Sequence, residues 1–142
     1  MPIAPRADFG SLSERAGWAD FLIAAARGGA GARHLINADV LTALGPKGYL
    51  VNIGRGTVVD TEALIDALQS KRIAGAGLDV VEGEPKVPPR LPQLLQFDNV
   101  VITPHCAGRA PESQTAATTL ILANLNAYFA GKPLLSPVPV KG

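Results

Sequence analysis

Three polar side chains, Arg55, Glu84 and His105, are the residues whose types could do chemistry together. The planar guanidinium of an arginine suits a carboxylate that is held by two hydrogen bonds. Histidine is the side chain best suited to exchange a proton near neutral pH. A carboxylate within hydrogen-bond reach of that histidine fixes its tautomer and its ring orientation. The chemistry to look for is therefore binding of an acidic ligand together with transfer of a proton.

Each of the three side chains follows an apolar run that we expect to be a buried strand. The runs lie at 49–53 before Arg55, at 74–80 before Glu84 and at 99–103 before His105. The carboxyl ends of parallel strands meet at one edge of a sheet, where open α/β sheets bind their ligands. The two glycines that flank Arg55 free the backbone at the turn. We therefore predict one site, built from three successive strand ends.

The elements that would position these side chains alternate between strand and helix. The expected order is a strand at 21–26, a helix to 44, a strand at 49–53, a helix at 61–70, a strand at 74–80, a loop with four prolines at 82–96, a strand at 99–103 and a long helix at 111–130. This order implies a parallel sheet with right-handed crossovers. The fold class is therefore α/β, with flanking helices and a long C-terminal helix.

Local signals set the expected helix ends. Asn37 and Asp60 stand where N-cap residues belong, and Gly45 stops the first of the two helices. Pro111 suits the first residue of the long helix. That helix is apolar around much of its girth, so we expect it to be buried on more than one side.

Composition limits the classes of partner and of compartment. The chain has 142 residues and a net charge of +1 without a basic run, so nothing points to nucleic acid or to an anionic membrane. The apolar run at 21–26 is too short to span a bilayer, and residues 1–10 lack the apolar core of a signal peptide. Cys106 is the single cysteine, which excludes an internal disulfide and predicts a reducing, cytoplasmic location.

Plainer explanations remain open for each candidate side chain. Arg55 could be a loop arginine that pairs with a nearby acid or is solvated, and Glu84 could be a solvated loop acid. His105 could be a histidine whose hydrogen bonds are made by backbone at a strand end. Cys106 beside His105 is better explained as a small packed cysteine than as a nucleophile, because consecutive residues leaving a strand point apart. Two histidines with unclustered acids do not predict a metal site.

The series of motifs resembles the D-isomer-specific 2-hydroxyacid dehydrogenases, in particular the glyoxylate/hydroxypyruvate reductase branch. The matching segments run from about residue 18 to 138 and include N-x-x-R-G, G-L-D-V, E-P and T-P-H in the family's order. They are HLIN at 34–37, LGPKG at 44–48, VNIGRG at 51–56, VVD at 58–60, AGLDV at 76–80, EP at 84–85, NVVITPH at 99–105 and GKPLL at 131–135.

The resemblance implies an oxidoreductase that transfers a hydride between a nicotinamide cofactor, NADP or NAD, and a small 2-keto acid such as glyoxylate or hydroxypyruvate. Its catalytic set would be Arg55, Glu84 and His105. Arg55 would hold the carboxylate and keto oxygen of the substrate, His105 would donate a proton to that oxygen, and Glu84 would hold the histidine in its charged form. The residues implied in cofactor binding are Ile53, Gly54, Arg55, Asp79, His105, Ala107 and Gly108.

One feature of the family is missing from the sequence. A G-x-G-x-x-G turn binds the pyrophosphate of a dinucleotide, but the three G-x-G sequences, at 29–31, 54–56 and 75–77, lack the third glycine. The resemblance therefore covers the second half of a Rossmann-like cofactor domain, and the family's chains are more than twice this length. We expect a lead-in at 1–17, the partial NAD(P)-binding domain at 18–110, the long helix at 111–130 and a tail at 131–142.

Two functional hypotheses follow from this partial coverage. The chain is either the catalytic half of a dehydrogenase, or an inactive truncated remnant or interaction module. Members of the family are typically dimeric, so a homo-oligomer, or pairing with a chain that supplies the missing half, is the implied association.

Overall fold

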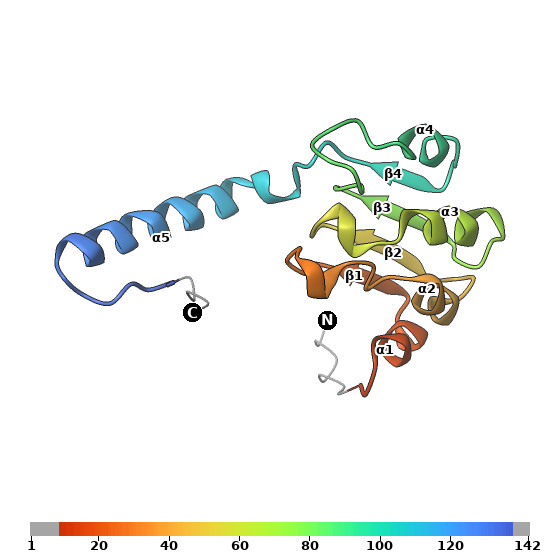
Figure 1. The fold of residues 1–142 in the computed structure, drawn as a ribbon, viewed down its shortest axis with the longest axis horizontal. Coiled ribbons are helices and arrows are strands. Elements are labelled where there is room, and N and C mark those ends of the chain that lie inside the picture. Colours follow the sequence, from red (N-terminus) through yellow and green to blue (C-terminus); the bar gives the residue numbers. More distant parts are fainter. Residues whose placement is uncertain (1–8, 138–142) are drawn as a thin grey trace. The chain divides into compact units, whose positions relative to one another are not determined.

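The computed structural model describes residues 9–137, which form two compact units, 9–105 and 106–137 (Figure 1). Each unit is described by itself. The outer parts of the expected lead-in at 1–17 and of the expected tail at 131–142 lie outside the described residues.

The first unit alternates strands and helices, as the sequence predicts. Its elements are α1 (Leu12–Trp18), β1 (Phe21–Ala24), α2 (Ala38–Leu44), β2 (Tyr49–Asn52), α3 (Thr61–Gln69), β3 (Gly75–Leu78), α4 (Leu91–Leu94) and β4 (Val100–Ile102), with 3₁₀ turns at Ala30–Ala32 and Gly56–Val58. The four strands form one parallel sheet in the order β1-β2-β3-β4. The predicted α/β class with a parallel sheet is confirmed.

The predicted helix caps form as expected. The Asn37 side chain accepts hydrogen bonds from the first backbone N–H groups of α2, and Asp60 Oδ1 accepts from the Ala63 N–H at 3.2 Å. Gly45 ends α2 with φ of 78°, a backbone conformation that glycine adopts without steric cost. The core between the sheet and these helices is apolar, with Leu41 and Leu50 fully buried.

Two segments contain more helix than the sequence analysis expects. The expected lead-in at 1–17 contains the helix α1, which Ser11 caps and which packs against α2; Ala16 of this helix is buried. The proline-rich segment at 82–96, expected as a loop, contains α4, where Pro92 occupies the first turn and Leu94 is fully buried. Burial of Leu94 in the core offsets the low helix propensity of this segment.

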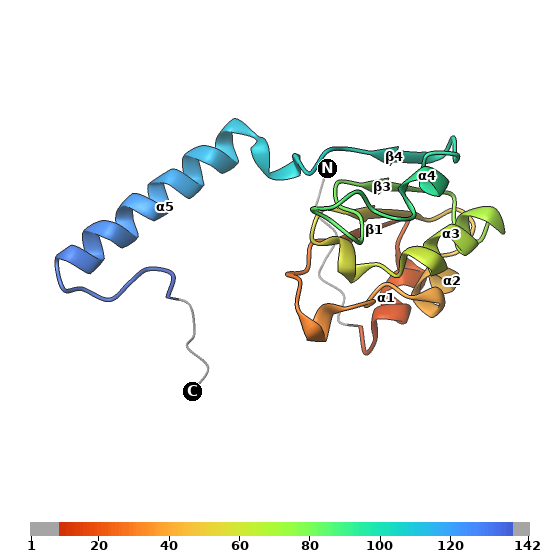
Figure 2. The ribbon, with the colours of Figure 1, turned by 45° about the horizontal axis from the view of Figure 1, so that its top comes forward.

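All three crossovers of the sheet step in the same direction, from β1 toward β4. Since such crossovers are right-handed, their connections lie on one face of the sheet, and Figure 2 shows α2 and α3 on the same side. The other face carries Phe21, Ile23, Tyr49 and Val101, whose exposed fractions are 64%, 59%, 42% and 66%. Parallel sheets are normally buried on both faces, so the 9–105 unit leaves an apolar sheet face without a covering layer of its own.

The second unit consists of a 3₁₀ turn at Ala107–Arg109, the helix α5 (Pro111–Phe129) and the segment that follows it. The expectation that this helix is buried on more than one side is wrong for the chain as described, because Ala127 is its only buried residue. Its large apolar side chains are exposed, namely Leu120, Ile121, Leu122, Leu125, Tyr128 and Phe129. Over residues 9–137 there is no helix with both the length and the apolar character needed to cross a bilayer.

Candidate functional site

The carboxyl ends of β1, β2 and β3 open onto a cleft of about 690 Å³. Its walls come from the segments that follow these strands, at 25–28, 53–57 and 80–85, together with one residue that follows β4. Arg55, Glu84 and His105 all line this cleft. The structure thus brings the three candidate catalytic side chains to one edge of the sheet.

Arg55 lies in the cleft wall, and no acidic side chain of the described residues pairs with it. Its side chain is exposed, and Nη1 donates to the Gly54 carbonyl at 2.8 Å. Among residues 9–137, none of the ion pairs involves Arg55. A guanidinium has five N–H donors, so several remain for an anionic ligand. Pairing with a nearby acid, one of the plainer explanations of this arginine, is not what the structure shows.

The backbone at Arg55 is held by a buried side chain that the sequence analysis did not single out. Asn52 is fully buried at the end of β2; its Nδ2 donates to the Arg55 carbonyl and its Oδ1 accepts from the Gly54 N–H, both at 3.1 Å. The signal was present in the sequence, as one amide in an otherwise apolar strand. A buried amide needs hydrogen-bond partners, and here it finds them in the turn that presents the guanidinium.

The two glycines around Arg55 serve close packing, which corrects the expectation that they free the backbone. Neither has a positive φ. A Cβ atom at Gly54 would lie 2.6 Å from the Ala26 carbonyl oxygen, and one at Gly56 would lie 2.2 Å from the Val81 carbonyl oxygen. The turn is therefore wedged between the segments that follow β1 and β3.

The ring of His105 is held by Glu84. Nδ1 lies 3.0 Å from Glu84 Oε2, while Glu84 Oε1 accepts a hydrogen bond from the Val81 N–H at 2.8 Å. The carboxylate thus bridges the imidazole and the backbone of its own loop. Because Glu84 engages Nδ1, Nε2 is the ring nitrogen from which a proton could reach a ligand in the cleft. Glu84 is therefore not simply a solvated loop acid.

The backbone of His105 adopts an uncommon conformation. Its φ is 52°, in the left-handed region that few non-glycine residues occupy. Its N–H donates to the carbonyls of Asp79 and Thr103, both at 3.0 Å. Hydrogen bonds from backbone thus fix the main chain of this histidine, and its ring remains available to Glu84. Strained conformations of this kind persist where the surrounding structure determines them, often at functional sites.

The remaining residues implied in cofactor binding are placed differently. Ile53 and Gly54 line the cleft. Asp79 is buried, accepts a hydrogen bond from the Thr103 hydroxyl and is not among the residues that line the cleft. Ala107 and Gly108 belong to the other unit, in the turn Ala107–Arg109. The cleft described here is built without them.

The residues of the first unit fit the nicotinamide ring of a dinucleotide cofactor better than they fit its pyrophosphate. Small side chains and backbone at Ala25, Ala26 and Gly54 line the cleft and leave room for a flat ring. A pyrophosphate needs free N–H groups at a helix N-terminus. The N-terminal N–H groups of α2 and α3 are instead capped by Asn37 and by the Asp60 carboxylate, which repels an anion.

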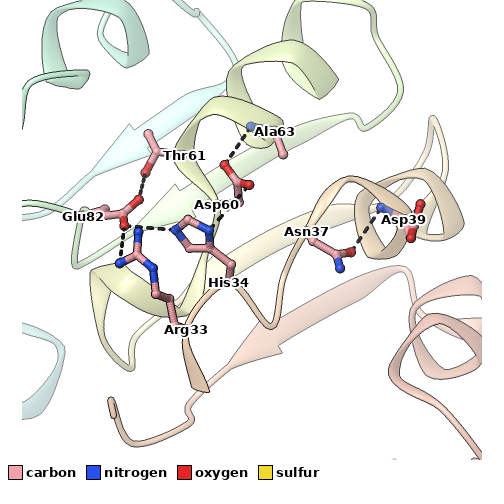
Figure 3. Close-up of polar contacts among 8 residues, drawn as sticks. All are labelled: Arg33, His34, Asn37, Asp39, Asp60, Thr61, Ala63 and Glu82. Atoms are coloured by element: carbon pink, nitrogen blue, oxygen red, sulfur yellow. Dashed lines mark hydrogen bonds and ion pairs between the residues drawn. The ribbon is translucent and has the colours of Figure 1, made fainter. Parts of the chain in front are cut away.

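A second polar cluster, unforeseen in the sequence analysis, lies at the N-terminus of α3 (Figure 3). Glu82 Oε1 lies 3.0 Å from His34 Nε2 and 3.1 Å from Arg33 Nη1, and Glu82 Oε2 lies 3.5 Å from the Thr61 hydroxyl. His34 Nδ1 lies 3.6 Å from Asp60 Oδ2. Over the described ranges, no group of histidine, cysteine and acidic side chains has the arrangement of a metal site.

Comparison with known proteins gives consistent matches. The sequence model of the family described as D-isomer specific 2-hydroxyacid dehydrogenase, NAD binding domain, matches residues 4–107. The 2-ketogluconate reductase of Gluconobacter oxydans is 49% identical over 127 residues, which are 89% of this chain and 40% of the relative. The hydroxyphenylpyruvate reductase of Plectranthus scutellarioides is 46% identical over 130 residues, 92% of this chain and 41% of the relative.

A solved structure gives the same picture. The NADPH-dependent glyoxylate/hydroxypyruvate reductase from Sinorhizobium meliloti, in complex with NADP and malonate, matches with a TM-score of 0.77 and 45% identity, covering 95% of this chain and 43% of that one. The chain thus spans about two fifths of the length of the curated relatives that it matches. The names of these relatives differ in the keto acid that is reduced.

Proposed function

Because the chain belongs to the D-isomer specific 2-hydroxyacid dehydrogenase family through its NAD-binding domain, we propose that it is the catalytic half of a nicotinamide-dependent oxidoreductase. The substrate would be a small 2-keto or 2-hydroxy acid of the glyoxylate/hydroxypyruvate type. One observation carries the proposal. A guanidinium that forms no ion pair within residues 9–137 lines the same cleft, at the carboxyl ends of the strands, as a glutamate–histidine pair.

Arg55 would bind the substrate carboxylate and polarise the keto oxygen. Its guanidinium provides donors in a fixed planar arrangement that matches a carboxylate. Asn52 and the two flanking glycines hold the turn, so the charge is positioned before the substrate arrives. A preorganised cation stabilises the negative charge that develops on the keto oxygen during reduction.

His105 would supply the proton that completes the reduction. A nicotinamide bound in the cleft would supply the hydride to the carbonyl carbon, so that the keto acid would be reduced and the cofactor oxidised. The C=O double bond becomes a C–O single bond, and the oxygen takes a proton from His105 Nε2. Glu84 keeps the ring oriented through Nδ1 and stabilises the charged imidazole before it gives up that proton. In the reverse direction, the same ring accepts the proton of a 2-hydroxy acid.

The cofactor would be NADP or NAD, with its nicotinamide end in this cleft. Ile53 and Gly54 line the cleft beside Arg55 and would contact the nicotinamide ring. We also assign Asp79 and His105 to the nicotinamide side of the site. The cofactor-binding role of Ala107 and Gly108, which lie in the second unit, rests on the family resemblance alone. The capped helices α2 and α3 offer no place for the pyrophosphate. Binding of the whole dinucleotide therefore requires residues beyond those described.

We infer that the missing pyrophosphate-binding half comes from further polypeptide, whether continuous with this chain or supplied by a partner chain. A second copy has the same residues, so a homo-oligomer could cover the apolar sheet face but could not supply that half. Two features support this inference. First, all crossovers of the sheet lie on one face, so its second, apolar face is left uncovered within residues 9–105. Second, residues 9–105 provide no binding site for the pyrophosphate. The single cysteine supports a cytoplasmic, reducing location for such an assembly.

Heteronuclear NMR on the isotopically labelled chain tests the proposal directly. Nicotinamide mononucleotide and glyoxylate should shift the amide signals of 53–57, 80–85 and His105. NADPH and NADH should bind weakly, with very slow reduction of glyoxylate. If both small ligands left these signals unchanged at millimolar concentration, the cleft would not be a nicotinamide and keto-acid site. Micromolar binding of NADPH with rapid turnover would contradict the requirement for further polypeptide.

The second candidate function is that of an inactive remnant or interaction module. The exposed apolar surface of α5 and of the bare sheet face favours it, because contiguous apolar surface of this kind usually contacts another protein. Size-exclusion chromatography with light scattering, combined with the NMR binding experiment described above, distinguishes the dehydrogenase half from the interaction module. Stable association without any response of the cleft to ligands would favour the interaction module.

A further inference from the structure

We propose that Glu82 and His34 form a clamp that sets the position of Glu84, and through it the ring of His105. Both would be positioning residues for the reaction proposed above, on which this inference rests. Glu82 lies two residues before Glu84 but does not line the cleft, whereas its neighbours Val81 and Gly83 do. One side of this loop therefore faces the cleft, and Glu82 contacts residues outside it.

The contacts of Glu82 come from two separate elements (Figure 3). His34 Nε2 and Arg33 Nη1, from the segment before α2, lie 3.0 and 3.1 Å from Oε1. The Thr61 hydroxyl, from the first residue of α3, lies 3.5 Å from Oε2. The side chains of His34 and Glu82 are only 30% and 24% exposed, so water screens their contact less than it screens a surface ion pair.

His34 is itself fixed in place. Its φ is 50°, its N–H donates to the Thr57 carbonyl at 2.9 Å, and its Nδ1 lies 3.6 Å from Asp60 Oδ2. Two further backbone hydrogen bonds join this segment to the chain that follows Arg55, from the Ile36 N–H to the Val58 carbonyl and from the Asp60 N–H to the Ile36 carbonyl. The clamp thus connects the segment that carries Arg55 to the loop that carries Glu84.

A displacement of the Glu82 side chain would move Glu84, because both residues belong to a short turn that is closed by hydrogen bonds. The Val81 N–H donates to Glu84 Oε1 at 2.8 Å, and the Glu84 N–H donates to the Val81 carbonyl at 3.4 Å. The same Val81 carbonyl is packed against Gly56. A shift of the turn would therefore change the distance between Glu84 and His105 and disturb the Arg55 segment as well. Misplacement of a catalytic group by about 1 Å can lower a rate by about 100-fold.

The clamp can be tested without an assay of activity. In Glu82→Ala and His34→Ala, the amide of Val81 should exchange with solvent at least about tenfold faster, because the turn that protects it opens. The ¹⁵N signals of the His105 ring should move toward those of a histidine without a carboxylate partner. The polar variants Glu82→Gln and His34→Gln, which retain a hydrogen-bonding side chain, should recover much of both signals even if an alanine variant fails to fold.

Glu62→Ala provides the matched control. Glu62 is an acid in the first turn of α3 and, like Glu82, pairs with an arginine, but its partner is Arg90, which lies outside the 81–84 turn. This variant should leave Val81 exchange and the His105 ring signals unchanged. Unchanged signals in folded Glu82→Ala and His34→Ala would overturn the clamp, as would equal effects in Glu62→Ala.

A kinetic measurement separates the clamp from the proposed function. In an assembly that reduces glyoxylate, Glu82→Ala should lower kcat about 10- to 100-fold with a smaller change in KM, since the proton donor is misplaced while Arg55 still binds the carboxylate. An unchanged kcat with altered ring signals would overturn the positioning role. If the unmodified cleft failed to bind nicotinamide mononucleotide and glyoxylate while the ring signals still responded to Glu82→Ala, the proposed function would fail and the contact would stand.

Discussion

Glu84 and His105 follow neighbouring strands, β3 and β4, and meet through a 3.0 Å contact between Oε2 and Nδ1. The second oxygen of the same carboxylate is occupied by the Val81 N–H. One carboxylate therefore orients the ring and ties it to the loop backbone at once. This arrangement leaves Nε2 as the nitrogen through which the ring can exchange a proton with a ligand.

Replacement of Glu84 by glutamine should affect proton transfer more than substrate binding. The amide keeps the size of the side chain but removes the charge that stabilises a protonated ring. We expect kcat for glyoxylate reduction in a reconstituted enzyme to fall about 10²- to 10⁴-fold, the usual contribution of general acid catalysis, with KM changed far less. Glu62→Gln, on the surface of α3, is the control and should retain full activity. A normal kcat in Glu84→Gln would remove this residue from the mechanism.

Arg55 should not tolerate lysine. A lysine keeps the positive charge but lacks the planar set of donors that matches a carboxylate. We expect Arg55→Lys to lower kcat/KM for the keto acid by about 10²- to 10³-fold, the typical effect of removing one donor to a developing oxyanion. Fold stability should not change, because Arg55 is exposed and has no ion-pair partner in the described part of the chain. Arg27→Lys, on the same cleft wall, is the comparison.

The strand ends explain why much of the fold and the site could be predicted. Apolar runs before Arg55 and His105 indicated strands, and alternation with capped helices indicated a parallel sheet. That topology alone brings the carboxyl ends of the strands together. The exposed α5 was not foreseen, because an apolar helix pattern indicates that a partner exists but not that the partner lies in the same chain.

Contacts between loops were beyond the reach of sequence patterns. The contact of Glu82 with His34 joins residues that follow different strands, and no periodicity or spacing indicates it. Gly56 looked like a flexible turn residue, yet its role is to let the Val81 backbone approach. Both depend on loop conformations that tertiary packing determines. Asn52 could have been found, since a single amide in an apolar strand must have partners.

The packing at Gly56 predicts a large effect of a single added methyl group. A Cβ at this position would lie 2.2 Å from the Val81 carbonyl oxygen, so the two loops must move apart. We expect Gly56→Ala to lower the free energy of unfolding by about 1–3 kcal/mol, as overpacking of a core does. Chemical denaturation monitored by circular dichroism measures this change.

Gly31→Ala is the control for the Gly56 variant. A Cβ at Gly31 would meet no atom within 4 Å, and its backbone does not have a positive φ. Its free energy of unfolding should match the parent or exceed it slightly, because alanine restricts the unfolded chain. Equal stability of the two variants would show that the loops at Gly56 and Val81 separate without cost.

The bare sheet face predicts an association that a single charge should disrupt. Ile23 is 59% exposed on β1, beside the stacked rings of Phe21 and Tyr49, whose centroids lie 5.3 Å apart. If a second copy or a partner chain covers this face, Ile23→Lys would place a charge in an apolar interface without a partner. The variant should remain folded, with a free energy of unfolding within about 0.5 kcal/mol of the parent, because the residue is a surface residue in the isolated chain.

Sedimentation velocity at several concentrations measures this association, and Ile23→Lys should show a species of lower mass than the parent forms. Lys47→Glu, a charge change on an exposed residue outside the sheet, should leave the parent's mass distribution unchanged, and the same distribution in Ile23→Lys would show that association uses another surface.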